Sequence, residues 1–256
     1  MTMAPGHNHW NLPPPQPVTV FIGNFGSGKT EIAINYALAL RTTGARVQLV
    51  DLDIINLFFR SREARSHVEA QGIEVVAPAN EYAFADLPIL LREVAGAIAS
   101  ADGHVVLDVG GDDLGARVLG TYSATLRLQK ADVLQVVNQR RPFTDSAEGC
   151  QRMYNDLEAA SRLKVTGLVA NAHLIHETSV EVVQGGIAFA RAFGEQVGVP
   201  LRFASVERGV LETVGENAFD CPVLALERFM TSPWEPNQRR GPIGRPPTPA
   251  LPAGVK

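Results

Sequence analysis

The sequence predicts one α/β domain: a single doubly wound, mostly parallel sheet with helices on both faces. Two observations predict this fold. Short apolar runs alternate with helix-length periodic segments from about residue 18 to residue 230. The runs are continuously apolar rather than alternating, as expected for strands that helices cover on both faces. Repeated strand–helix alternation of this kind indicates right-handed βαβ units in one sheet.

The expected elements follow in chain order. Strands are expected at 18–22, 46–50, 73–76, 104–109, 132–138, 165–171 and 201–206. Helices are expected at 29–42, 57–70, 86–100, 112–129, 144–162 and 178–197, with a last helix at 223–230. Gly44 comes just past the first helix, where a left-handed cap is usual. Each strand is thus followed by the helix that returns the chain to the other end of the sheet.

Two proline-rich ends flank the folded domain, which is expected to span residues 18–232. Residues 1–17 and 233–256 contain few periodic apolar residues. Segments of this composition bury too little apolar surface to offset the entropy lost on ordering. Both ends are therefore expected to be disordered tails.

Composition excludes several classes of protein. A net charge of −4 over 256 residues argues against general nucleic-acid binding, which depends on a basic surface. No apolar stretch approaches the ~20 residues needed to cross a bilayer, and the polar N-terminus is no signal peptide. The two cysteines, Cys150 and Cys221, lie far apart and form no CxxC. We expect a cytoplasmic protein without a membrane anchor.

The segment GNFGSGKT follows the first strand and opens the first helix. It matches the phosphate-binding P-loop pattern, with Gly23, Gly28, Lys29 and Thr30 at the required positions. Backbone N–H groups of such a loop surround phosphate oxygens, while the lysine reaches the β- and γ-phosphates and the hydroxyl takes a Mg²⁺ site. The predicted nucleotide-binding residues of this segment are Gly23, Asn24, Phe25, Gly26, Ser27, Gly28, Lys29, Thr30 and Glu31.

Acidic residues follow the second strand in the run VQLVDLD. In a parallel sheet the carboxyl ends of the strands form the ligand edge, so Asp51 and Asp53 should lie beside the phosphate loop. A carboxylate there can hold magnesium through water or position the attacking water. One of the two can instead cap or brace the next segment, and we favour Asp53 for the role beside the water.

The fourth strand ends in a second acidic site, VVLDVGG. Asp108 has the Walker B arrangement, a carboxylate at a strand end that binds the Mg²⁺ shell. Asp108 to Gly111 also forms DxxG, in which a glycine N–H can sense the γ-phosphate. Asp112 is better interpreted as the N-cap of the next helix, because more negative charge beside a triphosphate would be repulsive.

Together these motifs resemble the MinD/ParA-type ATPases, the deviant-Walker-A, SIMIBI-class branch of the P-loop NTPases. The resemblance covers roughly residues 17–230 and rests on GNFGSGKT, VQLVDLDIIN, VVLDVGG, ADVLQVVNQ and GLVANAHL. It implies ATP and Mg²⁺ as cofactors and a homodimer that forms when ATP is bound. It also implies that Lys29, Asp53 and Asp108 are catalytic, and that Thr30, Asp53 and Asp108 hold the metal. Asn171 matches the asparagine that reads adenine, although it could also simply start a turn.

The loop departs from this family at one position. The family usually carries KGGxGK[ST], and its first lysine reaches the nucleotide of the partner across the dimer. Asn24 takes that place here and has no charge, while Phe25 replaces a glycine. Either hydrolysis is slow, or another cation substitutes, or the dimer contact differs. Phe25 could also be a docking side chain or a stacking surface.

Several arginines are candidates for the missing cation. Arg60 and Arg62 follow Asp53 in a region that commonly acts as a switch, next to Phe58 and Phe59. Arg140 and Arg141 close the fifth strand at the same edge of the sheet. An arginine there could reach a phosphate in cis or in trans, as an arginine finger does. Solvated or salt-bridged roles remain open for each of them.

Three functions remain open at this point. The leading hypothesis is an ATP-binding, slowly hydrolysing switch that dimerises and regulates or matures an unidentified partner protein. The second is an ATP-dependent small-molecule ligase similar to the cobyrinate and dethiobiotin synthetases. The third is a nucleotide-binding regulator without turnover, which Asn24 favours. A translation-type GTPase is disfavoured, because the segment that begins at Asn171 is NAHL and not NKxD.

Overall fold

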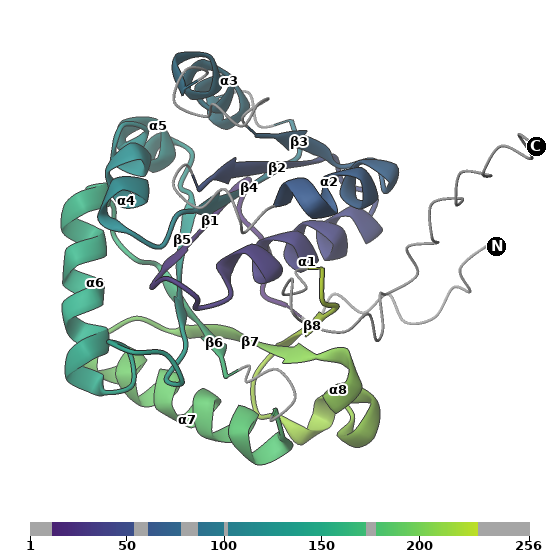
Figure 1. Ribbon diagram of the computed structural model, residues 1–256, viewed down its shortest axis with the longest axis vertical. Coiled ribbons are helices and arrows are strands. Elements are labelled where there is room, and N and C mark those ends of the chain that lie inside the picture. The colour runs from purple at the N-terminus through teal and green to yellow at the C-terminus, as the bar shows by residue number, and fades with distance from the viewer. Residues whose placement is uncertain (1–11, 54–60, 78–86, 100–101, 173–177, 230–256) are drawn as a thin grey trace, which may run out of the picture.

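Eight strands of the described residues form one sheet at the centre of the computed structural model (Figure 1). Their order is β3-β2-β4-β1-β5-β6-β7-β8, and every neighbouring pair is parallel. The structure describes residues 12–53, 61–77, 87–99, 102–172 and 178–229. The predicted fold class is confirmed: a single parallel sheet with helices on both faces.

The elements have the following bounds. The strands are β1 Val18–Gly23, β2 Val47–Leu52, β3 Glu74–Val76, β4 His104–Val109, β5 Asp132–Val137, β6 Gly167–Asn171, β7 Leu201–Glu207 and β8 Val223–Leu226. The helices are α1 Lys29–Thr42, α2 Ser61–Ala70, α3 Leu87–Ala99, α4 Asp113–Gly120, α5 Ser123–Leu128, α6 Ala147–Ser161, α7 Val180–Val197 and α8 Arg208–Val214, with a 3-10 turn at Glu216–Ala218.

The helices cover the two faces of the sheet unequally. Residues of α1 and α2 pack on one face, and residues of α3 to α7 pack on the other (Figure 1). Alternate residues of each strand belong to opposite cores. In β1, for example, Val20 and Ile22 face the larger core, while Phe21 packs edge-on against Tyr36 of α1. Burial on both faces explains why the strands are continuously apolar in sequence.

The last helix expected from the sequence is wrong. Residues Val223–Leu226 form β8, which pairs with β7 at the edge of the sheet. The run VLALERFM fits either element by its pattern alone, because a short apolar run carries no decisive period. The outcome depends on the neighbouring chain: β7 offers an open edge, and Asn35 of α1 hydrogen-bonds the backbone of Glu227 directly after β8.

The helix expected at 112–129 is two helices. The first, α4, ends at Gly120, and α5 begins at Ser123. Gly120 lies so close to α6 that an added Cβ would stand 2.8 Å from the carbonyl oxygen of Ala160. Tyr122, between the two helices, donates its hydroxyl to Leu91 O of α3. The break therefore allows close packing against α6 and α3.

Helix α8 was not expected from the sequence. Residues 57–60, the start of the helix expected at 57–70, lie outside the described residues.

The described chain begins within the segment expected to be the N-terminal tail. Leu12 is buried in the core on the α1 face. Pro17 O accepts a hydrogen bond from Val105 N at 2.8 Å. Residues 12–17 thus pack along the sheet, whereas 1–11 and 230–256 lie outside the described residues, and there the tails stay a prediction.

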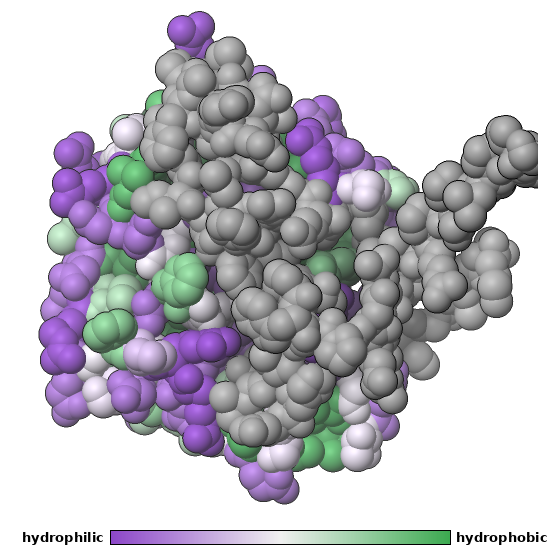
Figure 2. All heavy atoms as spheres, viewed as in Figure 1, coloured by the Kyte–Doolittle hydropathy of each residue, from purple (hydrophilic) through white to green (hydrophobic). Residues whose placement is uncertain are grey.

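Two local expectations are confirmed. Gly44 has φ 86° directly after the end of α1, as expected for a left-handed cap. Asp112 caps α4, since its Oδ1 accepts from Gly115 N at 2.7 Å. In the face shown in Figure 2, hydrophilic residues dominate the outer edge along α6. Among the described helices, none combines the length and the apolar composition needed to cross a membrane.

Candidate functional site

The loop between β1 and α1 lies at the carboxyl edge of the sheet. Three of its glycines have positive φ: Gly23 at 148°, Gly26 at 69° and Gly28 at 95°. A Cβ on Gly28 would overlap the side-chain amide of Asn171, so only glycine fits there. Ser27 N donates to Asn24 O at 3.2 Å and closes the turn. The loop is therefore a tight backbone cradle at the start of a 14-residue helix, which is a favourable place for an anion.

Lys29 turns its ammonium group back into this cradle. Its Nζ donates to Asn24 O at 2.9 Å, and the side chain is buried. Burial lowers the pKa of Lys29, and the carboxylates of Asp108, Asp53 and Asp112 oppose that shift. The ammonium group of Lys29 thus already lies in the loop, where phosphate oxygens would bind.

Two buried carboxylates stand side by side at the carboxyl edge of the sheet, and one of them, Asp108, acts on Lys29. Asp51 of β2 and Asp108 of β4 are register partners in the sheet, and both are almost fully buried. Burial and the neighbouring Asp51 raise the pKa of Asp108 to about 8, although a hydrogen bond with the Thr30 side chain and the charge of Lys29 act in the opposite direction. A carboxylate so perturbed at a sheet edge is typical of a functional site.

The residues expected to hold magnesium fit that ion. The buried Oδ1 of Asp108 has no hydrogen-bond partner among the described residues, and the Thr30 side chain is hydrogen-bonded to the same carboxyl group. Hard oxygen donors of this kind suit Mg²⁺, which usually binds one or two protein oxygens together with substrate phosphates. No cluster of three histidine, cysteine or acidic side chains that could hold a metal is found in the described part.

Asp51 and Asp53 differ in their surroundings. Oδ1 of Asp51 accepts from the backbone N–H of Asp53 at 3.0 Å, so Asp51 braces the end of β2. Asp53 is half-buried, and a Cβ on Gly110 would stand 3.3 Å from its Oδ1. The structure therefore brings Asp53 beside the DxxG segment that follows β4. The role beside the water stays a prediction for Asp53.

Gly111 joins the DxxG segment to the phosphate loop. A Cβ added there would stand 2.7 Å from both N and Cα of Phe25 and 2.8 Å from the Nζ of Lys29. A glycine at this point lets two loops from adjacent strands touch through their backbones. Because the two backbones are in contact here, movement of one loop would displace the other.

A family profile confirms what these features indicate. The profile of the CobQ/CobB/MinD/ParA nucleotide binding domain, CbiA, matches residues 18–184, which is more than half of the chain. The chain belongs to this family. The match begins at the first residue of β1 and includes the phosphate loop, both acidic strand ends and Asn171.

Solved structures share the fold of this CobQ/CobB/MinD/ParA domain at low sequence identity. The cell division protein FtsY from Thermotoga maritima is 20% identical, with a TM-score of 0.51 over 78% of this chain and 65% of that chain. The signal recognition particle 54 kDa protein from Aeropyrum pernix, in complex with GDP, is 17% identical, with a TM-score of 0.51 over 78% and 43%. Chloroplast FtsY from Physcomitrella patens is 18% identical, with a TM-score of 0.50 over 80% and 63%.

These structural likenesses show the fold alone, because one fold hosts many functions. This chain also covers less than two thirds of each of the three matched chains. No curated protein matches the chain.

Asn24, where the resemblance led us to expect a lysine, has a structural contact that the sequence did not indicate. Its Nδ2 donates to Pro142 O at 2.7 Å, and the side chain is buried. Pro142 belongs to the loop between β5 and α6, which is 118 residues away in sequence. Asn24 therefore fastens this second loop to the phosphate loop, while Phe25 beside it is 60% exposed.

Asn171 and Glu31 lie at the site with their side chains already engaged. Asn171 is buried, and its Nδ2 donates to Ser27 O at 2.6 Å, so its amide holds the phosphate loop. A role in reading adenine would require this bond to break. The carboxylate of Glu31 accepts from Phe229 N at 3.0 and 3.1 Å. The backbone N–H of Glu31, in the first turn of α1, remains the group that can face an anion.

Of the two candidate arginines whose side chains the structure describes, Arg141 approaches the phosphate loop. Its Nε stands 3.6 Å from the position of a Cβ on Gly26. Arg140 is exposed to solvent. Arg60, together with Phe58 and Phe59, lies outside the described residues, and nothing is described of the Arg62 side chain in α2. The sequence named both arginines of the β5–α6 loop but had no signal to choose between them.

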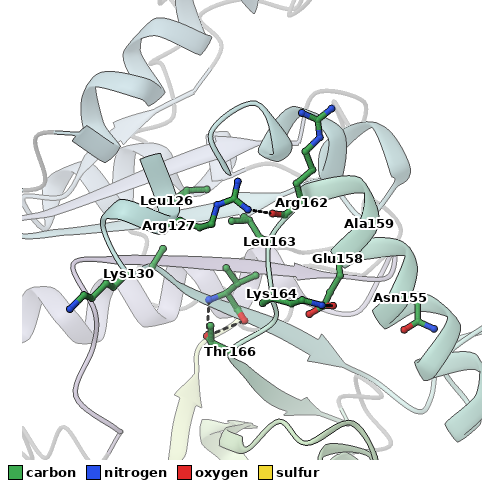
Figure 3. Close-up of a pocket in the computed structure, with 12 residues that line it drawn as sticks. Leu126, Arg127, Lys130, Asn155, Glu158, Ala159, Arg162, Leu163, Lys164 and Thr166 are labelled. Carbon is green, nitrogen blue, oxygen red and sulfur yellow. Dashed lines mark hydrogen bonds and ion pairs between the residues drawn. The ribbon is translucent and has the colours of Figure 1, made fainter. Parts of the chain in front are cut away.

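Two cavities are lined by residues other than those of the phosphate loop. One of about 630 Å³ is bounded by the ends of α5 and α6 and the starts of β5 and β6, at the amino edge of the sheet (Figure 3). Two of its four basic side chains are engaged within the protein: Lys164 pairs with Glu158, and Arg127 donates to Arg162 O at 2.9 Å. The other cavity, of about 720 Å³, lies between α4 and α6 and borders Gly111 and Asp112.

Proposed function

We propose that this protein is an ATP-binding, slowly hydrolysing nucleotide switch of the MinD/ParA kind, which dimerises with ATP and acts on a partner protein. The observation that carries the proposal is the cluster of buried Lys29, half-buried Thr30 and buried Asp108 at the phosphate-loop backbone. A lysine, a hydroxyl and a carboxylate oxygen without a hydrogen-bond partner are the groups that a magnesium nucleotide requires. Membership of the family supports it.

Each residue then has a defined task. The loop backbone and Lys29 would bind the β- and γ-phosphates, and Thr30 with Asp108 would hold Mg²⁺, which supplies charge to the transferring phosphoryl group. Asp53 would orient the attacking water, and Gly111 would report loss of the γ-phosphate through its contact with the loop. Asn24 carries no charge, so we expect slower hydrolysis than a lysine at this position would give.

ATP rather than GTP is the nucleotide that we propose. A guanine base is read in translation-type GTPases by the aspartate of NKxD, and the chain has NAHL where β6 ends. The amide of Asn171 offers the donor and the acceptor that an adenine edge needs once it releases Ser27 O. One matched structure contains GDP, so both nucleotides belong in the test.

The phosphate loop is tested by binding of ATP and GTP, with Mg²⁺, to the full-length protein in a calorimeter. We expect ATP to bind more tightly than GTP, and Lys29→Ala to lose at least about tenfold in affinity, because a charge-assisted contact is removed. Lys164→Ala is the matched control, since this ammonium is 86% exposed at the other edge of the sheet. Unchanged affinity of Lys29→Ala for both nucleotides would overturn the assignment of the site.

One observation favours a second candidate, an ATP-dependent small-molecule ligase. The cavity between α4 and α6 begins at Gly111 and is lined by charged side chains that include Arg117 and Asp156. A ligase forms ADP only when its acceptor is present, whereas a switch turns over ATP alone. Release of phosphate from ATP without any small-molecule acceptor would therefore support the switch. Nucleotide-dependent dimerisation without turnover would indicate the non-hydrolysing regulator.

A further inference from the structure

The loop between β5 and α6 carries an arginine onto the phosphate loop. The backbone at Gly26 and the side chain of Arg141 approach so closely that a Cβ on Gly26 would stand 3.6 Å from Nε and 3.8 Å from Cδ and Cζ. Gly26 has φ 69° and belongs to the cradle that surrounds Lys29. The guanidinium therefore starts at the rim of the site where phosphates are expected.

The loop that carries Arg141 is fixed by its own hydrogen bonds. Thr144 donates its hydroxyl to Asn138 O at 2.8 Å and its N–H to Arg141 O at 3.2 Å. Arg141 N donates to Asn138 O at 3.2 Å. Asn138 and Thr144 are almost fully buried. A turn closed in this way holds its side chains in place before any ligand arrives, which lowers the entropic cost of binding.

Asn24 sets the distance between the two loops. Its amide donates to Pro142 O, the residue next to Arg141, at 2.7 Å. A lysine at position 24 has no amide group to make this contact in the same geometry. Asn24, which stands where we expect the family's lysine, thus attaches the β5–α6 loop, and with it Arg141, to the phosphate loop.

Arg141 has a buried hydrogen-bond donor that is not satisfied within the part of the chain that the structure describes. Its Nε is buried without a hydrogen-bond partner, and no ion pair of Arg141 is found among the described residues. Several other arginines of the described chain form ion pairs, for example Arg191 with Asp220 and Arg202 with Asp132. The Nε of Arg41 is also buried without a hydrogen-bond partner in this part of the chain, but that guanidinium donates through Nη1 to Ala45 O. A buried N–H without an acceptor is costly, so an acceptor from outside the protein is expected here.

The charge around Lys29 also calls for a further cation. Asp51, Asp53, Asp108 and Asp112 all lie near this one ammonium group or its neighbours. A bound triphosphate adds several negative charges to them. Magnesium and one lysine leave a deficit of positive charge, which a planar guanidinium is suited to reduce because it binds phosphate with two N–H groups.

We propose that Arg141 binds phosphate oxygens of the nucleotide and that Asn24 is the positioning residue that holds the β5–α6 loop over the phosphate loop. This inference rests on the proposed function and deepens it: the cation missing at position 24 is supplied from within the same chain. The ligand class is a nucleoside triphosphate, recognised at Arg141 through its phosphates and not through its base.

The test compares Arg141→Ala with Arg140→Ala in the full-length protein. Arg140 is the matched control, because it is the neighbouring residue and its side chain is exposed. Binding of ATP is measured with Mg²⁺ by calorimetry, and inorganic tripolyphosphate is used as a competitor that lacks the base. We expect Arg141→Ala to lower the affinity for both ATP and tripolyphosphate by about 10- to 100-fold. Arg140→Ala should change these affinities by less than about twofold.

Further variants separate binding from a structural role. Arg141→Lys should recover part of the affinity, because the charge remains and the fork is lost. Asn24→Ala should lower the affinity for ATP less than Arg141→Ala does. The double variant, Asn24→Ala with Arg141→Ala, should bind ATP as tightly as Arg141→Ala alone, since both residues act through one contact. If Arg141→Ala fails to fold by circular dichroism, Arg141→Gln keeps the bulk of the side chain and should show the same loss.

Affinity of Arg141→Ala equal to that of the wild type, with Lys29→Ala still defective, would overturn the inference and leave the nucleotide site standing. Equal losses in Arg140→Ala and Arg141→Ala would also overturn it, because a general charge effect explains them. Loss of ATP affinity with tripolyphosphate competition unchanged would place Arg141 at the base and refute the phosphate contact. A wild-type protein that binds neither ATP nor GTP would overturn the proposed function as well.

Discussion

The carboxyl group of Asp108 is buried, and burial strongly disfavours its charged form. Its pKa is raised to about 8, whereas the unfolded chain has the ordinary value of 3.8. Between these values the folded protein keeps a proton that the unfolded chain releases, so the stability of the nucleotide-free protein falls as pH rises from about 4 to about 8. We predict that Asp108→Asn is more stable than the wild type, by about 1–4 kcal/mol at pH 8.

Urea unfolding at pH 5 and pH 8 without nucleotide checks this prediction, and the advantage of Asp108→Asn should be larger at pH 8. Asp156→Asn is the control, because that carboxylate is exposed and neutralising it should change little. The same Asp108→Asn variant should bind magnesium nucleotide poorly, since a ligand of the metal is weakened. An advantage that stays constant between the two pH values would contradict the buried-charge explanation.

The sequence identified the residues whose chemistry is tied to a motif, and it missed those defined by a contact across the fold. Lys29, Thr30 and Asp108 could be predicted because phosphate and magnesium impose both residue type and spacing. The contact of Asn24 with Pro142 joins segments 118 residues apart, and no local pattern encodes it. The same holds for the choice between Arg140 and Arg141, which depends on how one turn is closed.

The side chain of Asn35 in α1 fastens the end of the edge strand β8. Asn35 donates its Nδ2 to Glu227 O at 2.9 Å and accepts from Glu227 N at 2.9 Å, so it pairs both backbone groups directly after the strand. Asn35→Ala would leave both unpaired in a partly buried place. We predict a loss of about 1–3 kcal/mol in the free energy of unfolding. Faster amide hydrogen exchange should be confined mainly to β8 and the residues that follow it.

Gln151→Ala is the matched control, because its amide makes only exposed side-chain contacts, with Asn155 of α6 and Gln196 of α7. It should change the free energy of unfolding by less than about 0.5 kcal/mol. Equal exchange rates in Asn35→Ala and the wild type over residues 223–227 would show that β8 is held by its pairing with β7 alone.

Secondary structure could be predicted wherever an element is long or its ends are marked. Asp112 marks the start of α4, and the glycine loop marks the start of α1. The strand β8 could not be predicted, because VLALERFM is as compatible with a helix as with an edge strand until β7 and Asn35 are in place. The break between α4 and α5 likewise follows from the close approach of α6 at Gly120.

The fold of the whole molecule was the part most fully encoded in the sequence. Continuously apolar strands separated by helix-length segments permit little except a parallel sheet covered on both faces with right-handed crossovers, whereas the order of the strands comes from the structure. Strand order in such a sheet also brings the ends of β1, β2, β4, β5 and β6 to one edge, where the phosphate loop, the acidic residues and Arg141 meet. The site could be located before its contacts were known.

That same edge presents two exposed aromatic residues, which bears on assembly. Phe25 is 60% exposed and Phe143 is 74% exposed, and Phe143 also has φ 69°, an uncommon conformation for a bulky residue. A side chain that is exposed and strained beside the site is a candidate for contact with a second copy. We predict that Phe143→Asn weakens ATP-dependent dimerisation by about tenfold or more, because aromatic residues contribute much of the free energy of an interface.

Light scattering of the full-length protein with ATP, with ADP and without nucleotide measures this effect. Asparagine tolerates positive φ, so Phe143→Asn should keep the stability and the ATP affinity of the monomer. Leu128→Asn is the matched control: its side chain is 84% exposed at the end of α5, on the opposite edge of the sheet, and should leave dimerisation unchanged. A wild-type mass that does not respond to ATP would contradict dimerisation itself. A normal dimer of Phe143→Asn would instead move the interface away from the β5–α6 loop while leaving the nucleotide site intact.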